Sequence, residues 1–381
     1  MNRILLVFFL CFLSMLLATA QTDINQDWRL AQQYYQRGEY DKAVTLYEKI
    51  YESNPNSSSY YRQYYKSLLA MKDFEKAEKL VKKQMKRRKN DANLMVDLGL
   101  LYKNQDLVDQ ADAEFDKALK SIDANQVHRL ASTFINADEY DYAIDTYLKG
   151  RQMLKDDKAY GRELGQAYQK KGDMPNMISS YLDYGVTTPV GIQTVRNELQ
   201  RITTNEDNME ELQTQLYSRI QQDNKEITYP ELLVWTFKQQ KDYESALIQI
   251  TALDKRLQEE GDRVMELANQ ANLEKDYDVA IEAYEYVVAK GKENSLYLPA
   301  KIQLLSVRNT KIIETGDYTP EDLQKLETDY NDFLDIHGKS PNTVSTMRDL
   351  SHLYAYYIND FDAAIEILQE VLNMASVDGF Y

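Results

Sequence analysis

Apolar residues recur along this chain at alternating intervals of three and four positions, with charged residues between them. In the stretch YDKAVTLYEKIYESNP, this spacing is followed by Tyr40, Ala43, Tyr47 and Ile50. The spacing places the four side chains on one face of a helix. Gly38 stands just before the stretch and tolerates the positive φ of a tight turn. We therefore predict a helix that starts near residue 40 after a turn.

A second helix is predicted on the other side of this turn. Ala31 and Tyr34 fall on one face of that preceding helix. Asn54-Pro55 ends the later helix, because a residue before proline is disfavoured in the helical conformation. The resulting unit is a helix, a turn, a second helix and an exit loop.

This unit repeats with a period of about 34 residues. The second helix of each pair has one anchor position, which holds a small or medium-sized apolar residue: Ala43, Ala77, Ala111, Ala143, Met177, Leu212, Ala246 and Ala280. Bulky residues stand three positions before these anchors: Tyr40, Phe74, Val108, Tyr140, Met174, Met209, Tyr243 and Tyr277. Others stand four positions after them: Tyr47, Val81, Phe115, Tyr147, Tyr181, Leu216, Ile250 and Tyr284. A small residue between large ones lets helix axes approach to about 8–10 Å, so we predict closely packed helix pairs.

The pattern resembles the tetratricopeptide repeat (TPR) family. The first helices of two pairs carry the Leu-Gly…Tyr spacing of that family, at Leu98-Gly99…Tyr102 and Leu164-Gly165…Tyr168. The resemblance covers residues 24–185 and 227–290, and it returns at Phe361, Ala364, Leu368 and Val371. It implies an all-α, right-handed superhelical solenoid of about ten antiparallel helix pairs, two of them atypical.

We expect six segments in chain order. Residues 1–20 are a signal peptide, residues 21–185 hold five TPR-like pairs, and residues 186–226 form an atypical pair whose anchor is Leu212. Residues 227–294 hold two further pairs, and residues 295–343 form a longer atypical pair with a helix start at Thr319-Pro320. Residues 344–381 form another repeat. No polar capping helix follows it in the sequence, so the array is open to continuation.

The first 20 residues have the composition of a cleaved secretory signal. Arg3 supplies the positive start, residues 4–17 are almost wholly apolar, and Ala18-Thr19-Ala20 supplies small residues at the cleavage site. An apolar run of about 14 residues is short for a membrane span of roughly 20, although an uncleaved anchor is the alternative. The single cysteine, Cys11, lies inside this run, so we expect the mature chain to contain neither a disulfide nor a thiolate site.

Charge and motif content argue against nucleic-acid binding and catalysis. The formal net charge of −16 repels phosphate backbones and anionic lipid surfaces. The three histidines, His128, His337 and His352, are far apart, and metalloprotease, phosphate-loop and serine-elbow motifs are absent from the sequence. We therefore predict a non-enzymatic protein with no catalytic, cofactor or metal site and no membrane insertion after signal cleavage.

The resemblance implies that partners bind in a concave groove formed by the first helices of the pairs. The candidate groove residues are Tyr35, Arg62, Lys66, His128, Arg162, Gln166, Trp235 and Lys238. Arg62 and Lys66 are similar to half of the family's clamp for a carboxylate, but Val96 and Leu100 stand where polar residues of the other half are expected. Trp235 is the best single candidate, since tryptophan is enriched among interface hot spots; packing between pairs is the alternative.

Two further features are candidates for binding. A basic run contains Lys82, Lys83, Lys86, Arg87, Arg88 and Lys89. It is either a solvated helix end or a docking patch for an acidic partner segment. Of the 30 tyrosines, many occupy core positions of the repeat, whereas Tyr60, Tyr61, Tyr64 and Tyr65 are expected to be freer to line a binding surface.

The predicted function is a scaffold or adaptor for other proteins. The alternatives are a periplasmic holdase chaperone for unfolded or translocating chains, and the targeting arm of a longer protein with a domain after residue 381. The composition and signal resemble exported TPR proteins of Gram-negative bacteria of the Bacteroidetes type. That resemblance implies a periplasmic location or association with the periplasmic face of the outer membrane.

Overall fold

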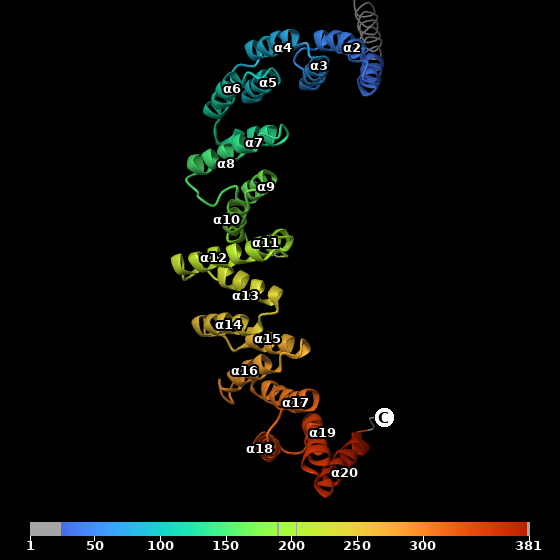
Figure 1. Ribbon diagram of the computed structural model, residues 1–381, viewed down its shortest axis with the longest axis vertical. Helices are drawn as coiled ribbons and strands as arrows, with labels where there is room; N and C mark the ends of the chain where they lie inside the picture. The colour runs from blue at the N-terminus through green and yellow to red at the C-terminus, as the bar shows by residue number, and fades with distance from the viewer. Residues whose placement is uncertain (1–23, 189, 203, 379–381) are drawn as a thin grey trace, which may run out of the picture. The chain divides into compact units, whose positions relative to one another are not determined.

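The computed structural model describes residues 24–188, 190–202 and 204–378. Every regular element in these ranges is a helix, and consecutive helices form pairs (Figure 1). The predicted all-α fold of helix pairs is therefore confirmed. The predicted signal peptide, residues 1–20, lies outside the described residues.

The chain divides into two compact units, Met1–Tyr181 and Leu182–Tyr381, and the boundary falls within helix α10 (Met174–Gly185). In the first unit, residues 24–36 are helical. The helices that follow are α2 (Tyr40–Ser53), α3 (Ser58–Met71), α4 (Phe74–Arg87), α5 (Ala92–Lys103), α6 (Val108–Ser121), α7 (Val127–Ile135), α8 (Tyr140–Leu154) and α9 (Gly161–Lys171). A short 3-10 turn, Ala124–Gln126, precedes α7.

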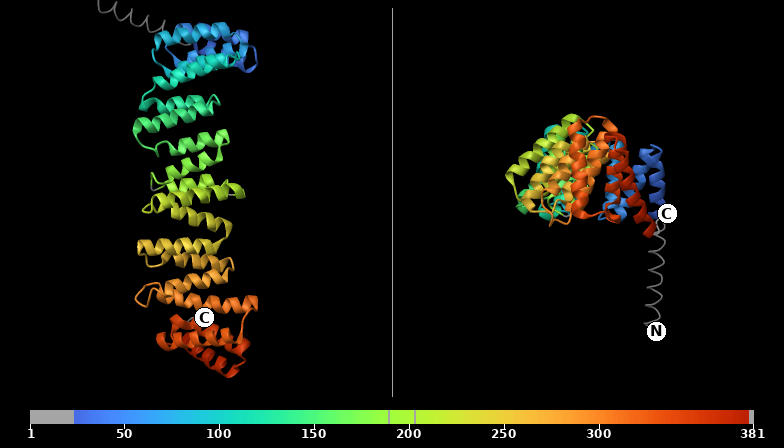
Figure 2. Two further views of the ribbon diagram at one scale, coloured as in Figure 1. Left: turned by 60° about the vertical axis from the view of Figure 1, so that its left-hand side comes forward. Right: turned by 90° about the horizontal axis from the view of Figure 1, so that it is seen from below.

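The second unit continues the same alternation. Its helices are α11 (Gly191–Leu199), α12 (Glu206–Gln222), α13 (Thr228–Gln240), α14 (Tyr243–Leu257), α15 (Asp262–Leu273), α16 (Tyr277–Val288), α17 (Tyr297–Thr315), α18 (Pro320–His337), α19 (Val344–Leu353) and α20 (Phe361–Asp378). A 3-10 turn, Pro341–Thr343, precedes α19, and a π-helical turn, Tyr354–Ile358, follows it. Within each unit the helices lie in successive layers (Figure 2).

The helix boundaries follow the local signals of the sequence. Gly38 has a φ of +76° in the turn before α2, and that helix ends at Ser53, just ahead of Asn54-Pro55. The hydroxyl of Thr319 accepts a hydrogen bond from the backbone N–H of Asp322, whose carboxylate accepts one from the Thr319 N–H in return. This reciprocal cap fixes the predicted start of α18.

The core follows the predicted repeat register. All eight anchor positions, from Ala43 to Ala280, are buried, and so are the bulky residues four positions after them. Gly99 is required by close packing, because a Cβ atom there would lie 2.4 Å from the ring of Phe115. A Cβ atom on Gly165 would likewise lie 2.9 Å from the ring of Tyr181. The glycine of the Leu-Gly…Tyr spacing thus makes room for an aromatic ring of the partner helix.

Two predictions about exposure are wrong. Val108, the first residue of α6, is 55% exposed, whereas the larger first residues Tyr243 of α14 and Tyr277 of α16 are buried. Tyr61, Tyr64 and Tyr65 are buried rather than exposed, although Tyr61 and Tyr65 also line a hollow of the first unit. Their rings fill the core beneath α3 while their hydroxyls reach polar groups at its edge, as when Tyr64 donates a hydrogen bond of 2.8 Å to Glu48.

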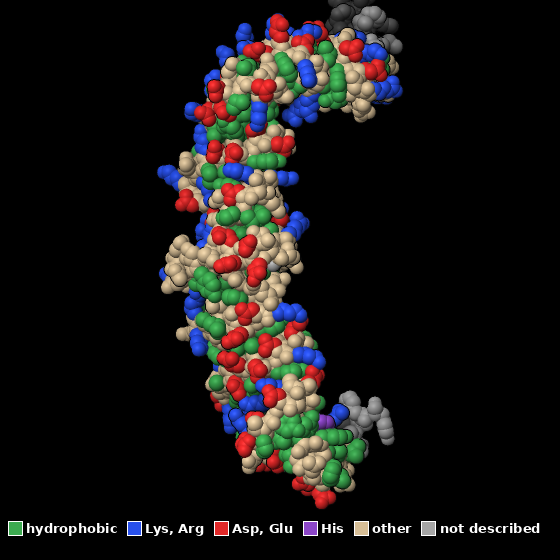
Figure 3. Space-filling view, viewed as in Figure 1, with side chains coloured by type: hydrophobic (Ala, Val, Ile, Leu, Met, Phe, Trp, Pro, Cys, Tyr) green, Lys and Arg blue, Asp and Glu red, His purple; other side chains and the backbone are tan. Residues whose placement is uncertain are grey.

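The last helix presents an apolar stripe to solvent. The stripe consists of Phe361, Ile365, Leu368 and Leu372, all exposed, and Figure 3 shows apolar side chains gathered at this end. At the equivalent register of α2, which packs against α3, three residues are buried: Val44, Tyr47 and Tyr51. The same side-chain pattern is therefore core in one pair and surface in another, depending on whether a further helix covers it.

Candidate partner-binding grooves

The first unit contains an open hollow of about 750 Å³ between α3, α5 and α7, which we call the α3–α5–α7 groove. It is lined by Ser58, Tyr61, Arg62, Tyr65, Lys66, Leu69, Arg88, Asp91, Asn93, Leu94, Asp97, Leu100, Arg129, Thr133, Asn136 and Ala137. Most of these residues belong to first helices of successive pairs. The volume lies in the range of about 300–1,000 Å³ that is typical of ligand sites.

Basic side chains from two helices and one loop converge on this groove. Arg62 and Lys66 are exposed on α3, and Arg129 joins them from α7. Arg88, which follows α4, lies 5.6 Å from the ring centre of Tyr61 and pairs with Asp91 at 3.4 Å. Arg88 thus connects two features that are separate in the sequence, the basic run and the Arg62–Lys66 pair.

Asp97 is the acidic residue at the centre of α5 in this groove. Its carboxylate accepts a hydrogen bond of 2.8 Å from the Tyr61 hydroxyl, and its backbone carbonyl accepts one of 2.5 Å from Tyr65. Burial raises the pKa of Asp97 to about 6, although the Tyr61 hydrogen bond and the charge of Arg62 act in the opposite direction. The charge of the groove therefore changes in mildly acidic solution.

The expected groove face of α5 is wrong at one position. Val96 is fully buried, and Asn93 and Asp97 line the groove in its place, together with the predicted Leu100. The groove face of α5 consists of positions 93, 94, 97 and 100, while Ala92 and Val96 pack in the core. The half-clamp on α3 therefore shares the groove with an amide and a carboxylate as well as with Leu94 and Leu100.

Four other predicted groove residues lie outside this hollow. Tyr35 packs against the ring of Tyr40 at 5.3 Å. His128 lies beside Tyr147, with the histidine Nδ1 and the tyrosine hydroxyl 3.4 Å apart. Arg162 and Gln166 are exposed on α9. The structure therefore gathers only part of the predicted set in the first unit, and Arg129 is a groove residue that the sequence did not single out.

Most of the basic run lies on the surface around the C-terminal end of α4. Lys82 pairs with Glu78 at 2.5 Å, and Lys83 lies 5.8 Å from the ring centre of Tyr51. Exposed positions are also held by Lys86, Arg87 and Lys89. Of the six residues, only Arg88 lines the α3–α5–α7 groove.

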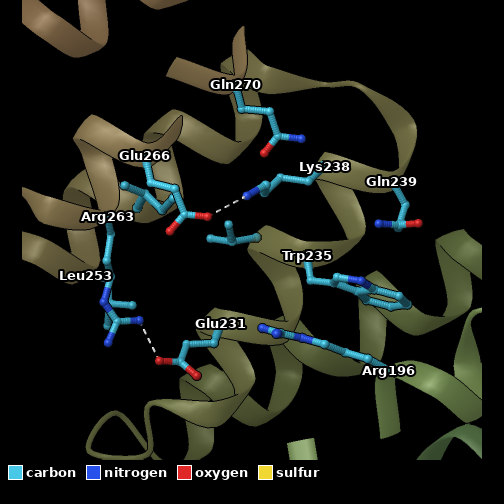
Figure 4. A pocket seen from close by; sticks show the side chains of 11 residues that line it. Arg196, Glu231, Trp235, Lys238, Gln239, Leu253, Arg263, Glu266 and Gln270 are labelled. Atoms are coloured by element: carbon cyan, nitrogen blue, oxygen red, sulfur yellow. Dashed lines mark hydrogen bonds and ion pairs between the residues drawn. The ribbon is translucent and has the colours of Figure 1, made fainter. Parts of the chain in front are cut away.

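The second unit contains another hollow, of about 520 Å³, which we call the Trp235 pocket (Figure 4). Its lining comes from α11, α13, α14 and α15, and consists of Arg196, Glu231, Val234, Trp235, Lys238, Gln239, Ile250, Leu253, Arg263, Glu266 and Gln270. It brings together Trp235 and Lys238, both predicted as groove residues. The Trp235 side chain is half-buried at the pocket wall.

Ion pairs organise the walls of the Trp235 pocket. Arg263 pairs with Glu231 at 2.5 Å and with Glu259 at 3.1 Å, and Lys238 pairs with Glu266 at 3.5 Å. The pairs Arg263–Glu231 and Lys238–Glu266 connect α13 to α15 across the pocket. Both carboxylates that line it are therefore already compensated by a cation.

Arg196 is a pocket residue that the sequence did not single out. It reaches the pocket from α11, and Figure 4 places its side chain beside the indole of Trp235. Its Nε is buried and makes no hydrogen bond within the described residues. Arg196 belongs to the atypical pair, whose first helix has no residue pattern that would have fixed its register in the sequence.

Metal binding and membrane insertion find no structural support within the described ranges. No group of three or more His, Cys, Asp or Glu side chains there is arranged to hold a metal ion. Among these same residues, none of the helices has both the length and the apolar character of a membrane span.

Comparisons with known proteins agree with a helical-repeat architecture. The family model described as anaphase-promoting complex, cyclosome, subunit 3 matches residues 10–84. No curated protein sequence matches the chain. The match supports the resemblance to tetratricopeptide repeats over the first pairs.

Several solved structures also match. The TPR domain of P58(IPK) is 15% identical, with 92% of this chain and 93% of that chain covered and a TM-score of 0.24. A chain of Naa15/Naa10 bound to HypK-THB is 16% identical, with 92% of this chain covered and a TM-score of 0.28, and this chain spans 58% of its length. A thermophilic TPR protein of Thermus thermophilus is 17% identical over 47% of this chain and 97% of that chain, with a TM-score of 0.27. At TM-scores this low, these structures are no evidence for the fold, which is established by the helices and their packing.

The fold and the two hollows define the class of this protein. It is a helical-repeat protein built of TPR-like pairs, with open, charged and aromatic hollows along its first helices. Proteins with TPR repeats generally mediate protein–protein interactions.

Proposed function

We propose that this chain is a non-enzymatic scaffold that binds segments of other proteins along its first helices. The observation that carries the proposal is the repeated composition of the two hollows. One lies in each unit, both are lined mainly by first helices, and both place arginine and lysine beside an aromatic ring. Arginine, tyrosine and tryptophan are the residues enriched at the centres of protein interfaces.

The composition of the hollows favours an adaptor over a holdase. A chaperone that holds many unfolded chains needs an apolar and adaptable surface. The α3–α5–α7 groove instead presents fixed polar partners, such as Arg88 paired with Asp91 and Tyr61 bonded to Asp97. Polar groups in fixed positions discriminate between partners, because an unmatched group loses its hydrogen bonds. The adaptor therefore binds few partners with defined sequences.

The adaptor is proposed to work in the cell envelope after export. This part of the proposal rests on the signal-like composition of residues 1–20 and on the resemblance to exported TPR proteins. The intact mass of the protein purified from its own cells tests it. We expect a chain that begins at Gln21, and a mass that includes residues 1–20 would contradict export by cleavage.

Affinity purification with groove variants tests the binding role. Arg62→Gln with Lys66→Gln removes two cations from the α3–α5–α7 groove. Trp235→Ala removes the indole from the Trp235 pocket. The matched control is Lys49→Gln with Lys117→Gln, which removes two exposed cations from the second helices α2 and α6. Partner recovery is measured by quantitative mass spectrometry, and circular dichroism checks that each variant is folded.

We expect a groove variant to lose a defined partner that the control retains. Recovery of the same partners by all variants would contradict the proposal. Recovery of many proteins at low stoichiometry, reduced together in the groove variants, would favour the holdase instead.

A further inference from the structure

One cation of the Trp235 pocket has no anionic partner among the residues that the structure describes. The pocket is lined by three cations and two carboxylates. Glu231 pairs with Arg263, and Glu266 pairs with Lys238. The remaining cation is Arg196, whose buried Nε makes no hydrogen bond within the described residues. Arg196 is half-buried, and a buried donor without a partner is unfavourable, so Arg196 is suited to bind an anion from outside the chain.

We propose that the Trp235 pocket binds a protein segment in which an aspartate or glutamate lies next to a large apolar side chain. The carboxylate of the segment binds the guanidinium of Arg196, and the apolar side chain packs on the indole of Trp235. The inference rests on the proposed binding function and adds the chemistry of the partner. A guanidinium suits this role, because its planar fork of N–H donors matches the two oxygens of a carboxylate.

The placement of Trp235 supplies the second half of the site. Figure 4 shows its indole beside the side chain of Arg196, with Gln239 and Gln270 around the same opening. Val234 and Leu253 add apolar wall. A tryptophan next to an arginine offers a large apolar contact and a charge-assisted hydrogen bond side by side, which is the usual composition of an interface hot spot.

The charges around Arg196 favour a carboxylate over a phosphate. Arg196 is the one cation of the pocket without an ion pair among the described residues, and a single negative charge matches it. A phosphoryl group carries about −1.5 to −2 at pH 7 and would lie close to Glu231 and Glu266, which repel the excess charge. With a net charge of −16, the chain as a whole repels acidic segments. Binding therefore depends on the local pocket, within the screening length of about 8–10 Å at physiological salt.

A selection from a phage-displayed library of random peptides tests the inference. The full chain is the bait, and the Trp235→Ala variant is used for counter-selection. We expect the enriched peptides to share an aspartate or glutamate beside a leucine, isoleucine, methionine or aromatic residue. A fluorescein-labelled synthetic copy of the most enriched peptide then serves as the probe for affinity measurements.

We expect Arg196→Gln to weaken the probe about tenfold, the usual loss for a hydrogen bond between charged groups. Changing the acidic residue of the probe to its amide should cause the same loss, and the two changes together should cost little more than either alone. Arg196→Lys keeps the positive charge but loses the planar fork of donors. Its affinity for the probe should therefore lie between that of the wild type and that of Arg196→Gln. Arg348→Gln, at an exposed arginine of α19, is the matched control and should leave the affinity unchanged.

Three outcomes would overturn the inference. They are no enrichment over the Trp235→Ala counter-selection, enriched peptides without an acidic residue, and an unchanged affinity in a folded Arg196→Gln variant. If Trp235→Ala still lost a cellular partner under any of these outcomes, the binding function would stand and only the partner chemistry would be wrong. If neither peptide nor partner depended on the pocket, the proposed function would fail in this unit as well.

Discussion

Asp97 connects the packing of the first unit to the charge of its groove. The Tyr61 hydroxyl bonds its carboxylate, and the surrounding helices exclude much of the water that would otherwise stabilise its charge. Its pKa is therefore raised from 3.8 to about 6. Asp97 lines the candidate groove, and the ionised form of its carboxyl group therefore destabilises the folded state.

This position gives the unfolding free energy a defined pH dependence. Because the folded pKa lies above the unfolded value, the native state binds the proton more tightly, and stability falls as pH rises from about 4 to about 6. Asp97→Asn removes this loss, since the amide oxygen still accepts the Tyr61 hydrogen bond. We expect the variant to be more stable than the wild type at pH 7.5 and no more stable at pH 4.

Urea unfolding at the two pH values measures this difference. Asp157→Asn, at an exposed carboxylate of the same unit, is the control and should show no such pH-dependent gain. An equal gain for Asp97→Asn at both pH values, or a gain only at pH 4, would contradict the account of Asp97.

At the scale of helices, the sequence predicts the elements that depend on local signals. The anchors at the repeat period, Gly38 in its turn and Thr319 at its cap all lie where the pattern places them. These features are readable because each acts within one or two helical turns. The repeat also predicts the glycine of the Leu-Gly…Tyr spacing, although the role of this glycine is in packing against a neighbouring helix.

Groove composition is predictable only in part. The repeat register places Val96 at the position of Arg62, yet Val96 is buried and Asp97 lines the groove, so the facing of α5 depends on tertiary packing. The burial of Tyr61 and Tyr65 is not predictable from residue type, because tyrosine suits both a core and a binding surface. Arg196 belongs to a pair without a small anchor, so its direction depends on tertiary packing that no local pattern encodes.

The contact between α5 and α6 gives a prediction at this scale. Gly99→Ala places a methyl group against the ring of Phe115. We expect a loss of about 1–3 kcal/mol from overpacking, offset in part by the gain of up to about 1 kcal/mol that alanine brings inside a helix. Phe115→Leu in the same chain should recover part of the loss, because the smaller side chain makes room. Equilibrium unfolding of the single and double variants measures the coupling, and a net stabilisation by Gly99→Ala would refute the packing role of the glycine.

Across the whole chain, residues at the same position of the repeat differ in burial from one helix pair to another. Ile365 on α20 and Leu247 on α14 both follow an anchor alanine by one position, yet they are 54% and 3% exposed. We expect Leu247→Glu to destabilise the protein severely, because it buries a carboxylate without a partner. Ile365→Glu should change stability by no more than about 0.5 kcal/mol. Thermal unfolding of both variants tests the assignment, and comparable losses for the two would show that α20 is covered in solution.

The central claim, that partners bind along the first helices of both units, is tested most directly by photo-crosslinking in living cells. Probes are placed one at a time at Lys66 in the α3–α5–α7 groove and at Gln239 at the rim of the Trp235 pocket. Control probes stand on second helices, at Lys49, Lys117 and Glu244. We predict that a dominant protein is captured from the first-helix sites and not from the controls. Equal capture from both sets of sites would contradict the claim.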